Sequence, residues 1–467
     1  MKTPLVVVGC ALAALIGCRG STAPSGTEPS FIAINAATNA AVFPAAVIVC
    51  EGIGFGPRRE SSQVLVTVAG SLAPAEIDSW TGTEIHARLP EAVESGPVYV
   101  VTRSDTLGPV RIFVRAPSGF DPTTRSWAEG ARLPRALWGA GATSVRFPST
   151  TDVASLVLLN GGVDAAGRVV DSTYIGTVGG TGAITSWASA PDSVVPVPRY
   201  LHAIAGADRT NSRLELEAVA YMIGGADSTG LPLAGVLGIS LDAAGGYGLW
   251  TSLTPLPGAR IGAAAIVAFG NIIVVGGFGE DSVATTSVLT AQVNPEGTIN
   301  GWFSGPPLPE GLAFSALALH DTTLYVLGGE AGVISVADPA NADLRAAVYA
   351  IGISRRTGFF VGSAWKAMAP LPTARARHGA FALDSAIVVT GGIYAGMPSA
   401  QESEVAFIQS DGGLGAFAAT GQDPLAATAP LYGAAGPVLW SKAGITRATM
   451  IGGILPDSTV TARVWWH

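Results

Sequence analysis

The sequence is poor in cysteine, lysine and charge of either sign. Of its 467 residues three are cysteines and 13% are charged, and the lysines are Lys2, Lys366 and Lys442. Three cysteines are too few for a disulfide framework, and we expect Cys50 to be a buried small hydrophobe. With a formal net charge of −8, the chain has no basic surface for nucleic acid and little scope for Schiff-base chemistry.

Long uninterrupted hydrophobic runs are also missing. The longest internal apolar stretch, Ile261 to Phe278, is broken by Gly270 and Asn271, which predicts a buried hairpin rather than a membrane span. The composition, with 48% hydrophobic residues, 60 glycines and 31 prolines, is typical of an exported β protein with two domains.

Residues 1–17 read as a signal peptide. Lys2 precedes an apolar run from Leu5 to Ile16 that is too short for a transmembrane helix. Residues 15–18, Leu-Ile-Gly-Cys, resemble the bacterial lipobox, which implies lipidation of Cys18 and anchoring of the mature chain without a helix. The absence of Asp after this cysteine favours the outer membrane. The alternative is an ordinary secretory signal cleaved near Ala23.

Residues 18–30 are small, polar and proline-containing, and we expect a flexible tether there. Residues 31–115 contain short alternating or apolar runs between Gly, Pro and Ser turns, the pattern of a β-sandwich. The order of these runs and the turn Gly52–Gly56 resemble the IPT/TIG immunoglobulin-like domain, which often serves as a spacer or adhesion module. The same glycines approximate a dinucleotide-binding fingerprint, but residues 57–60 lead into another strand and not into a helix.

One unit recurs from Trp127 to the C-terminus, most clearly from Trp365 to Gly392. A Trp is followed by a Pro-Leu-Pro turn, an Arg, small and apolar residues, a polar turn, a short apolar run and a Gly-Gly pair. The pairs begin at Gly161, Gly224, Gly276, Gly328, Gly391 and Gly452, at spacings of 52 to 63 residues. Periods near 50 residues are typical of propeller blades. Residues 116–467 therefore resemble a kelch-type six-bladed β-propeller, and the chain as a whole is predicted to be all-β.

The two ends of the repeat region are expected to complete one blade. The last unit has almost no chain beyond residues 459–465, whereas Phe120 to Glu129 has the pattern of a fourth strand with no earlier strands before it. Since proteins avoid open sheet edges, residues 124–129 are predicted to pair with residues 459–465.

The repeated aromatic residues are predicted to pack between blades rather than to form a platform for sugars. They are Trp127, Trp187, Trp250, Trp302, Trp365 and Phe417. Trp465 and Trp466 are adjacent on one strand, so one of them must face away from the other, and the exposed one is a weak contact candidate.

The candidate binding residues are arginines that follow the proline turn and are expected at the mouth of the central channel. They are Arg135, Arg199, Arg260 and Arg375, with Leu312 in the corresponding place of the fourth unit. In kelch proteins that bind acidic peptides or sugars, arginines at this place line the pocket, so the resemblance implies an anion site. The alternative is structural pairing with acids that follow the glycine pairs. These are Asp164, Asp227, Glu280, Asp281, Glu330 and Asp457.

The sequence carries no hydrolase, zinc-protease or phosphate-loop motif, and no metal or cofactor is expected. His202 and His378 occupy the same repeat position in units on opposite sides of the channel, too far apart for one metal ion, and are expected to be framework residues. The predicted function is a monomeric cell-envelope lipoprotein that binds an extracellular protein or polysaccharide. The alternative is a kelch-type carbohydrate-active enzyme such as a sugar mutarotase.

Overall fold

The structure is a computed structural model, and its contacts divide the chain into two units, Met1–Val114 and Arg115–His467. The residues it describes are 30–34, 39–42, 47–68, 71–90, 92–114, 128–148, 153–179, 183–210, 216–242, 246–334, 342–383, 386–394, 403–409, 412–419, 432–442, 445–455 and 458–466. The predicted signal peptide, the lipidation site Cys18 and the tether up to residue 29 lie outside these ranges.

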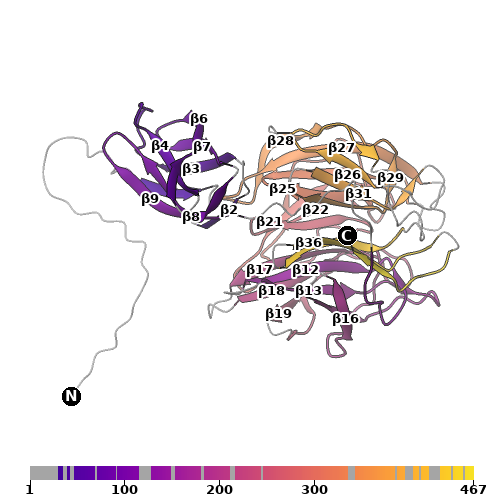
Figure 1. The fold of residues 1–467 in the computed structure, drawn as a ribbon. Coiled ribbons are helices and arrows are strands. Elements are labelled where there is room, and N and C mark those ends of the chain that lie inside the picture. The colour runs from indigo at the N-terminus through magenta and orange to yellow at the C-terminus, as the bar shows by residue number, and fades with distance from the viewer. Residues whose placement is uncertain are drawn as a thin grey trace, which may run out of the picture. The chain divides into compact units, whose positions relative to one another are not determined.

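The first unit is an immunoglobulin-like sandwich of two sheets (Figure 1). One sheet has the order β1 (Ser30–Ile34), β3 (Val47–Ile53), β7 (Glu84–Arg88), β6 (Glu76–Trp80). The other has the order β2 (Asn39–Val42), β9 (Thr106–Val114), β8 (Val93–Val101), β4 (Gln63–Val68), β5 (Ser71–Pro74). Alternate residues of these strands, such as Ile48 and Cys50 on β3 and Ile85 on β7, are fully buried, because successive side chains of a strand point to opposite faces.

The glycine-rich turn of this unit is structural. Gly54 and Gly56 have φ values of 74° and 66°, and the indole Nε1 of Trp80 donates a hydrogen bond of 2.9 Å to the carbonyl of Gly56. The chain continues through a short turn to β4, so no helix begins after the glycines. This arrangement agrees with the exclusion of dinucleotide binding.

The second unit is a six-bladed β-propeller built from six four-stranded antiparallel sheets. Blades 1 to 3 consist of β12 (Gly141–Pro148), β13 (Val153–Asn160), β15 (Thr173–Val178), β16 (Ile184–Ser189); β17 (Ala203–Thr210), β18 (Leu216–Ile223), β19 (Val236–Asp242), β20 (Thr251–Leu253); and β21 (Ala264–Ala268), β22 (Asn271–Val275), β23 (Val288–Gln292), β24 (Phe303–Ser304). Blades 4 to 6 consist of β25 (Ala316–His320), β26 (Thr323–Ala331), β27 (Asp343–Ile353), β28 (Phe360–Ala367); β30 (Gly379–Leu383), β31 (Ala386–Thr390), β33 (Glu404–Phe407), β34 (Ala418–Ala419); and β35 (Ala435–Lys442), β36 (Ile445–Ile451), β37 (Val464–Trp466), β10 (Ala128–Glu129). The first strands contact one another in the closed order β12, β17, β21, β25, β30, β35 and back to β12, so they surround the propeller axis.

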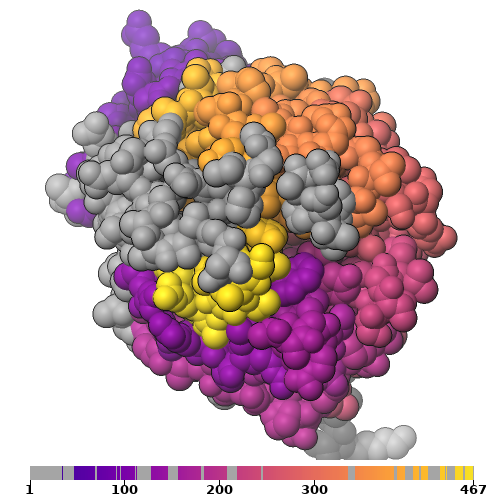
Figure 2. All heavy atoms as spheres, turned by 90° about the vertical axis from the view of Figure 1, so that its right-hand side faces the viewer, coloured from indigo at the N-terminus to yellow at the C-terminus, as the bar shows by residue number. Residues whose placement is uncertain are grey.

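The sixth blade joins the beginning of the propeller to the end of the chain. Glu129 lies opposite Trp465 and Ala128 opposite Trp466, and the amide of Gly130 donates a bond of 2.8 Å to the carbonyl of Val464. In Figure 2 the yellow C-terminal residues lie against the purple residues near the start of the propeller. Residues 124–127, including Trp127, lie outside the described residues.

In blades 1, 3 and 4 a tryptophan at the outer strand fixes the blade to the proline turn that leads into it. The indole nitrogens of Trp187, Trp302 and Trp365 donate bonds of 2.9, 3.1 and 2.8 Å to the carbonyls of Ala131, Thr254 and Pro306. Trp250 and Trp365 are only 6% and 7% exposed. These rings are therefore packing elements of the blades and are not available as a sugar platform.

Candidate functional site

The entrance to each inner strand is a residue in the left-handed conformation. These residues are Gly139, Leu201, Gly262, Phe314, Arg377 and Gly433, with φ values of 63°, 53°, 64°, 51°, 57° and 65°. Five of the six amides donate to the carbonyl of the corresponding residue in the preceding blade, from Leu201 to Gly139 (2.7 Å), Gly262 to Leu201 (2.9 Å), Phe314 to Gly262 (2.7 Å), Arg377 to Phe314 (3.0 Å) and Gly139 to Gly433 (2.8 Å). We call this girdle of hydrogen bonds around the axis the backbone ring.

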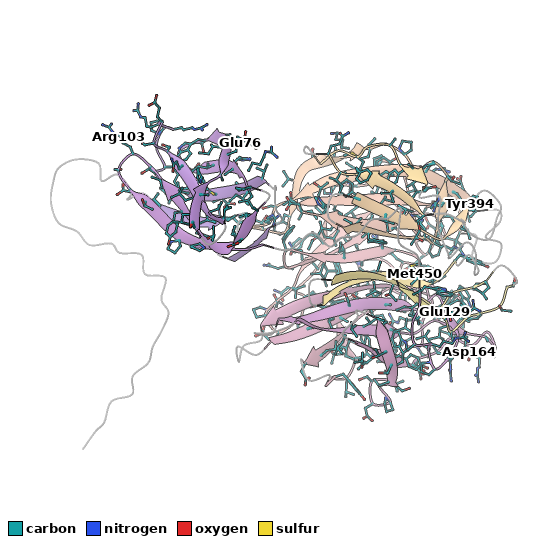
Figure 3. The ribbon with its side chains drawn as sticks, in the orientation of Figure 1. Glu76, Arg103, Glu129, Asp164, Tyr394 and Met450 are labelled. Atoms are coloured by element: carbon teal, nitrogen blue, oxygen red, sulfur yellow. The ribbon has the colours of Figure 1, made fainter. Side chains whose placement is uncertain are left out.

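A small cavity of 150 Å³, the axial chamber, lies at the backbone ring. Besides the ring residues, half-buried Trp138, Ser315 and Tyr432 line it. Trp138 also meets Tyr200 edge-on, with ring centroids 5.6 Å apart. The segment before each inner strand pairs with the residues after the glycine pair of the same blade, for example Trp138 with Val163, so these loops lie at the chamber end. Asp164 and Tyr394, which follow two of the glycine pairs, lie at this end in Figure 3, and Figure 2 views it face on.

Two of the predicted binding arginines are buried in the framework. Nη1 of Arg199 donates bonds of 3.1 Å to the carbonyls of both Gly224 and Gly235, and Nη1 of Arg260 donates to the carbonyls of Gly276 (2.9 Å) and Ser287 (3.1 Å). Burial lowers the pKa of Arg199 to about 10. Both guanidinium groups tie a glycine pair to the third strand of its own blade, so they do not face an incoming ligand.

The other two arginines differ from these and from each other. Arg375 is 2% exposed, donates to the carbonyl of Gly391 at 3.4 Å and forms a buried ion pair with Glu404. The side chain of Arg135 is 44% exposed and lies 3.7 Å from the carboxylate of Asp164. The expectation that all four arginines ring an open anion site therefore does not fit the geometry.

Arg135 does not occupy the repeat position of the other three arginines. The carbonyl of Arg199 accepts a hydrogen bond from the amide of Gly162, the second glycine of the pair in the preceding blade, and the carbonyl of Arg260 accepts one from Gly225 in the same way. In blade 1 the carbonyl that accepts the corresponding bond, from Gly453, is that of Leu137. Leu137 is therefore the counterpart of Arg199 in blade 1. Adjacency of Pro and Arg in the sequence suggested the wrong residue.

The acids that follow the glycine pairs mostly cap their own loops. Oδ1 of Asp164 accepts the amides of Ala166 (2.9 Å) and Arg168 (3.0 Å), and these bonds help to lower the pKa of Asp164. Oδ1 of Asp227 likewise accepts the amide of Thr229 at 2.8 Å. The alternative of arginine pairing with loop acids fits Arg135 alone among the four candidates, and Asp457 lies outside the described residues.

The sequence interpretation missed a buried ion pair between adjacent blades at the backbone ring. Nη2 of Arg377 lies 3.2 Å from Oε2 of Glu330, and the two side chains are 3% and 0% exposed. The guanidinium also lies over the ring of Phe314, 4.5 Å from its centroid. Burial lowers the pKa of Arg377, and Glu330 opposes that shift.

The other blades have apolar residues at the positions of Glu330 and Arg377. The position of Glu330, which pairs with the segment before the inner strand, is held in the other blades by Val163, Ala226, Phe278, Ile393 and Ile454. At the position of Arg377 the other blades have glycine, leucine or phenylalanine. A comparison of the six units at these two positions could have revealed both residues.

The two repeat histidines are buried and neutral. Nε2 of His202 lies 2.7 Å from Oδ1 of Asn160, which directly precedes the glycine pair of the neighbouring blade. Among the described residues neither ring nitrogen of His378 has a hydrogen-bond partner. Burial, followed by the nearby Arg199 or Arg375, lowers the pKa of each histidine to about 3. This environment supports the framework role expected for them, and the described residues contain no cluster suited to a metal ion.

Comparisons with known proteins give a likeness of fold and no family. No protein-family model matches the sequence, and no curated protein matches it. Among 262 matching chains of solved structures is one titled "Structure of YjhT", which covers 71% of this chain and 95% of its own, with a TM-score of 0.47 and 13% identity. The propeller assignment rests on the sheet topology and not on this likeness.

Across the described ranges, no helix has the length and apolar character needed to cross a bilayer.

Proposed function

We propose that the protein is a lipid-anchored binding module of the bacterial cell envelope. In this proposal Cys18 carries the anchor, the sandwich, of IPT/TIG type, acts as a spacer, and the propeller binds an extracellular protein or polysaccharide at the chamber end. The anchor and the outer-membrane location are supported by the sequence of residues 1–18 alone.

The observation that carries the binding role is the aromatic group beside the axial chamber. Trp138, Tyr200 and Tyr432 are half-buried, whereas the indole nitrogens of Trp187, Trp302 and Trp365 are hydrogen-bonded to backbone carbonyls. A large aromatic face with an accessible polar edge suits both sugar rings and protein partners. The backbone ring beneath these side chains holds them on a rigid support, which lowers the entropy lost on binding. Arg135, which is exposed, can still contribute a cation at this end, but the buried arginines cannot.

The binding role is favoured over a sugar mutarotase because the described residues that line the chamber include no group suited to proton transfer at neutral pH. A general acid or base works best with a pKa near the operating pH. His202 and His378, which line the chamber, each have a pKa of about 3. Glu330 is fully buried and engaged with Arg377.

The test is a glycan and peptide array probed with the full chain carrying Cys18→Ser. For a ligand found in this way, Trp138→Ala and Tyr432→Ala are each expected to weaken binding about tenfold or more, the loss typical of an aromatic hot spot. Phe303→Ala is the matched control, because this aromatic side chain is 60% exposed on the outer strand β24. Equal losses for all three variants, or turnover of a sugar by the protein, would refute the proposal. Retention of the Cys18→Ser variant in the membrane fraction would refute the anchor.

A further inference from the structure

A second and larger cavity of 1170 Å³ occupies the propeller axis on the other side of the backbone ring. Residues of all six inner strands line it, from Ala142 on β12 to Val438 on β35. Pockets that bind small molecules typically measure about 300–1,000 Å³. This cavity, the axial channel, is thus large enough for a ligand of several rings.

Two features of the inner strands create the axial channel. Each inner strand stands at the end of its sheet order and has one neighbour, so its other edge presents backbone N–H and C=O groups to the channel. Small residues line the space, as in Ala142, Thr143 and Ser144 of β12. Gly206 of β17 lets this strand approach β12 closely, since a Cβ there would lie 2.8 Å from the carbonyl oxygen of Ser144. The wall is therefore a set of hydrogen-bond donors and acceptors placed around an axis.

The described residues that line the axial channel are uncharged. None of the described residues that line it is ionisable, and its polar side chains are those of Thr143, Ser144, Gln292 and Asn294. Half-buried Phe269 adds an aromatic face where the wall reaches the turns of blade 3. A charged ligand would lose its hydration here without gaining a counter-ion.

We propose that the axial channel binds an uncharged carbohydrate segment. Sugar hydroxyl groups both donate and accept hydrogen bonds and radiate in all directions, which matches six strand edges arranged around an axis. An extended peptide fits less well, because its backbone groups lie in one plane and can satisfy two opposite edges at most. The apolar faces of sugar rings would meet Phe269 and the aliphatic wall. This site is separate from the axial chamber, and the inference does not depend on the binding role proposed there.

The experiment is ligand protection of a thiol placed in the channel wall. In the full chain carrying Cys10→Ser and Cys18→Ser, the variant Ser144→Cys introduces a half-buried thiol that lines the channel. Native Cys50 does not interfere, because it is fully buried and burial raises its pKa to about 12. Ser363→Cys on β28 is the matched control, since this serine is exposed and is absent from the channel wall. The probes are neutral trisaccharides of glucose, mannose and N-acetylglucosamine, with trigalacturonate and a neutral tripeptide as competitors.

At least one neutral trisaccharide is expected to slow alkylation of the thiol at position 144 about tenfold at about ten times its dissociation constant. Alkylation at position 363 should not change, and Trp138→Ala should leave the protection intact. The inference is overturned if no neutral trisaccharide protects, or if trigalacturonate or the tripeptide protects equally well. A thiol at position 144 that does not react in the free protein would also overturn it, because the channel would then be closed.

Discussion

The ion pair between Glu330 and Arg377 gives the sharpest test of the reasoning about the backbone ring. Both side chains are almost completely buried, so removing one partner takes the ion pair away from the other buried charge. Breaking such a pair typically destabilises a protein by about 3–5 kcal/mol. We therefore expect Glu330→Ile to lower the free energy of unfolding by about that amount, although isoleucine is the residue at the corresponding positions 393 and 454.

Replacing both partners should restore most of the free energy of unfolding that either single substitution removes. Arg377→Gly also breaks the buried ion pair, but it removes a non-glycine residue from φ 57°, which recovers about 1–2 kcal/mol. In the double variant Glu330→Ile, Arg377→Gly the shell resembles that of the other blades. Replacement of a buried pair by apolar residues is often neutral or stabilising by about 1–4 kcal/mol, so the double variant should be close to the parent protein in stability.

The assay is guanidinium-induced unfolding of the parent, the two single variants and the double variant, analysed as a double-mutant cycle. A coupling free energy of about 3 kcal/mol or more is expected, because the two residues are in contact. The control is Arg135→Ala, which removes the 3.7 Å contact with Asp164 from a side chain that is 44% exposed; such a pair contributes about 1 kcal/mol or less. Two small and additive effects, each near 1 kcal/mol, would show that the pair is not energetically important and would refute the reasoning.

Three further predictions concern single side chains. Arg199→Ala should destabilise the propeller by several times as much as Arg135→Ala. The first substitution leaves the carbonyls of Gly224 and Gly235 without their hydrogen-bond donor, whereas the second removes an exposed contact. Equal shifts in unfolding midpoint would contradict this. Unfolding midpoints should fall as the pH drops from about 6.5 toward 3, because His202 binds a proton in the unfolded chain but stays neutral when buried in the folded protein. His202→Gln should make the unfolding midpoint depend less on pH; an unchanged dependence would mean that the imidazole is protonated in the folded state. Cys50 should resist alkylation at neutral pH in the folded protein and react after unfolding; rapid reaction in the native state would show that the sandwich core opens.

The fold was accessible from the sequence because its signals repeat. The glycine pairs adopt positive φ, as at Gly224 and Gly225 with φ of 64° and 94°, and side chains other than glycine rarely accept this conformation. A Cβ on Gly225 would also lie 2.7 Å from the Cβ of His202. One physical requirement therefore marks every blade, and the all-β architecture with six blades follows from counting it.

The binding residues were not accessible in the same way. A Pro-Arg pair looks alike at Arg135 and Arg199, but only the backbone register shows that Leu137 is the counterpart of Arg199. Arginine also has two uses that the sequence cannot separate: it can bind an anion, or it can satisfy buried carbonyls. In this propeller the guanidinium groups of Arg199 and Arg260 have the second use.

The backbone ring shows why the remaining site chemistry is a property of neighbouring blades and not of any one unit. Its glycines make room for the larger ring residue that follows: a Cβ on Gly262 would lie 2.4 Å from the ring of Phe314, and one on Gly139 would lie 3.2 Å from Leu201. Arg377, the next large residue, lies over the ring of Phe314. Small and large residues are thus matched across blade boundaries, and the strained φ of the large ones is tolerated because the surrounding hydrogen bonds fix it. Exchanging a glycine and its larger neighbour would keep the composition of the repeat but place two side chains in one space, so the ring can vary only through coupled changes in adjacent blades.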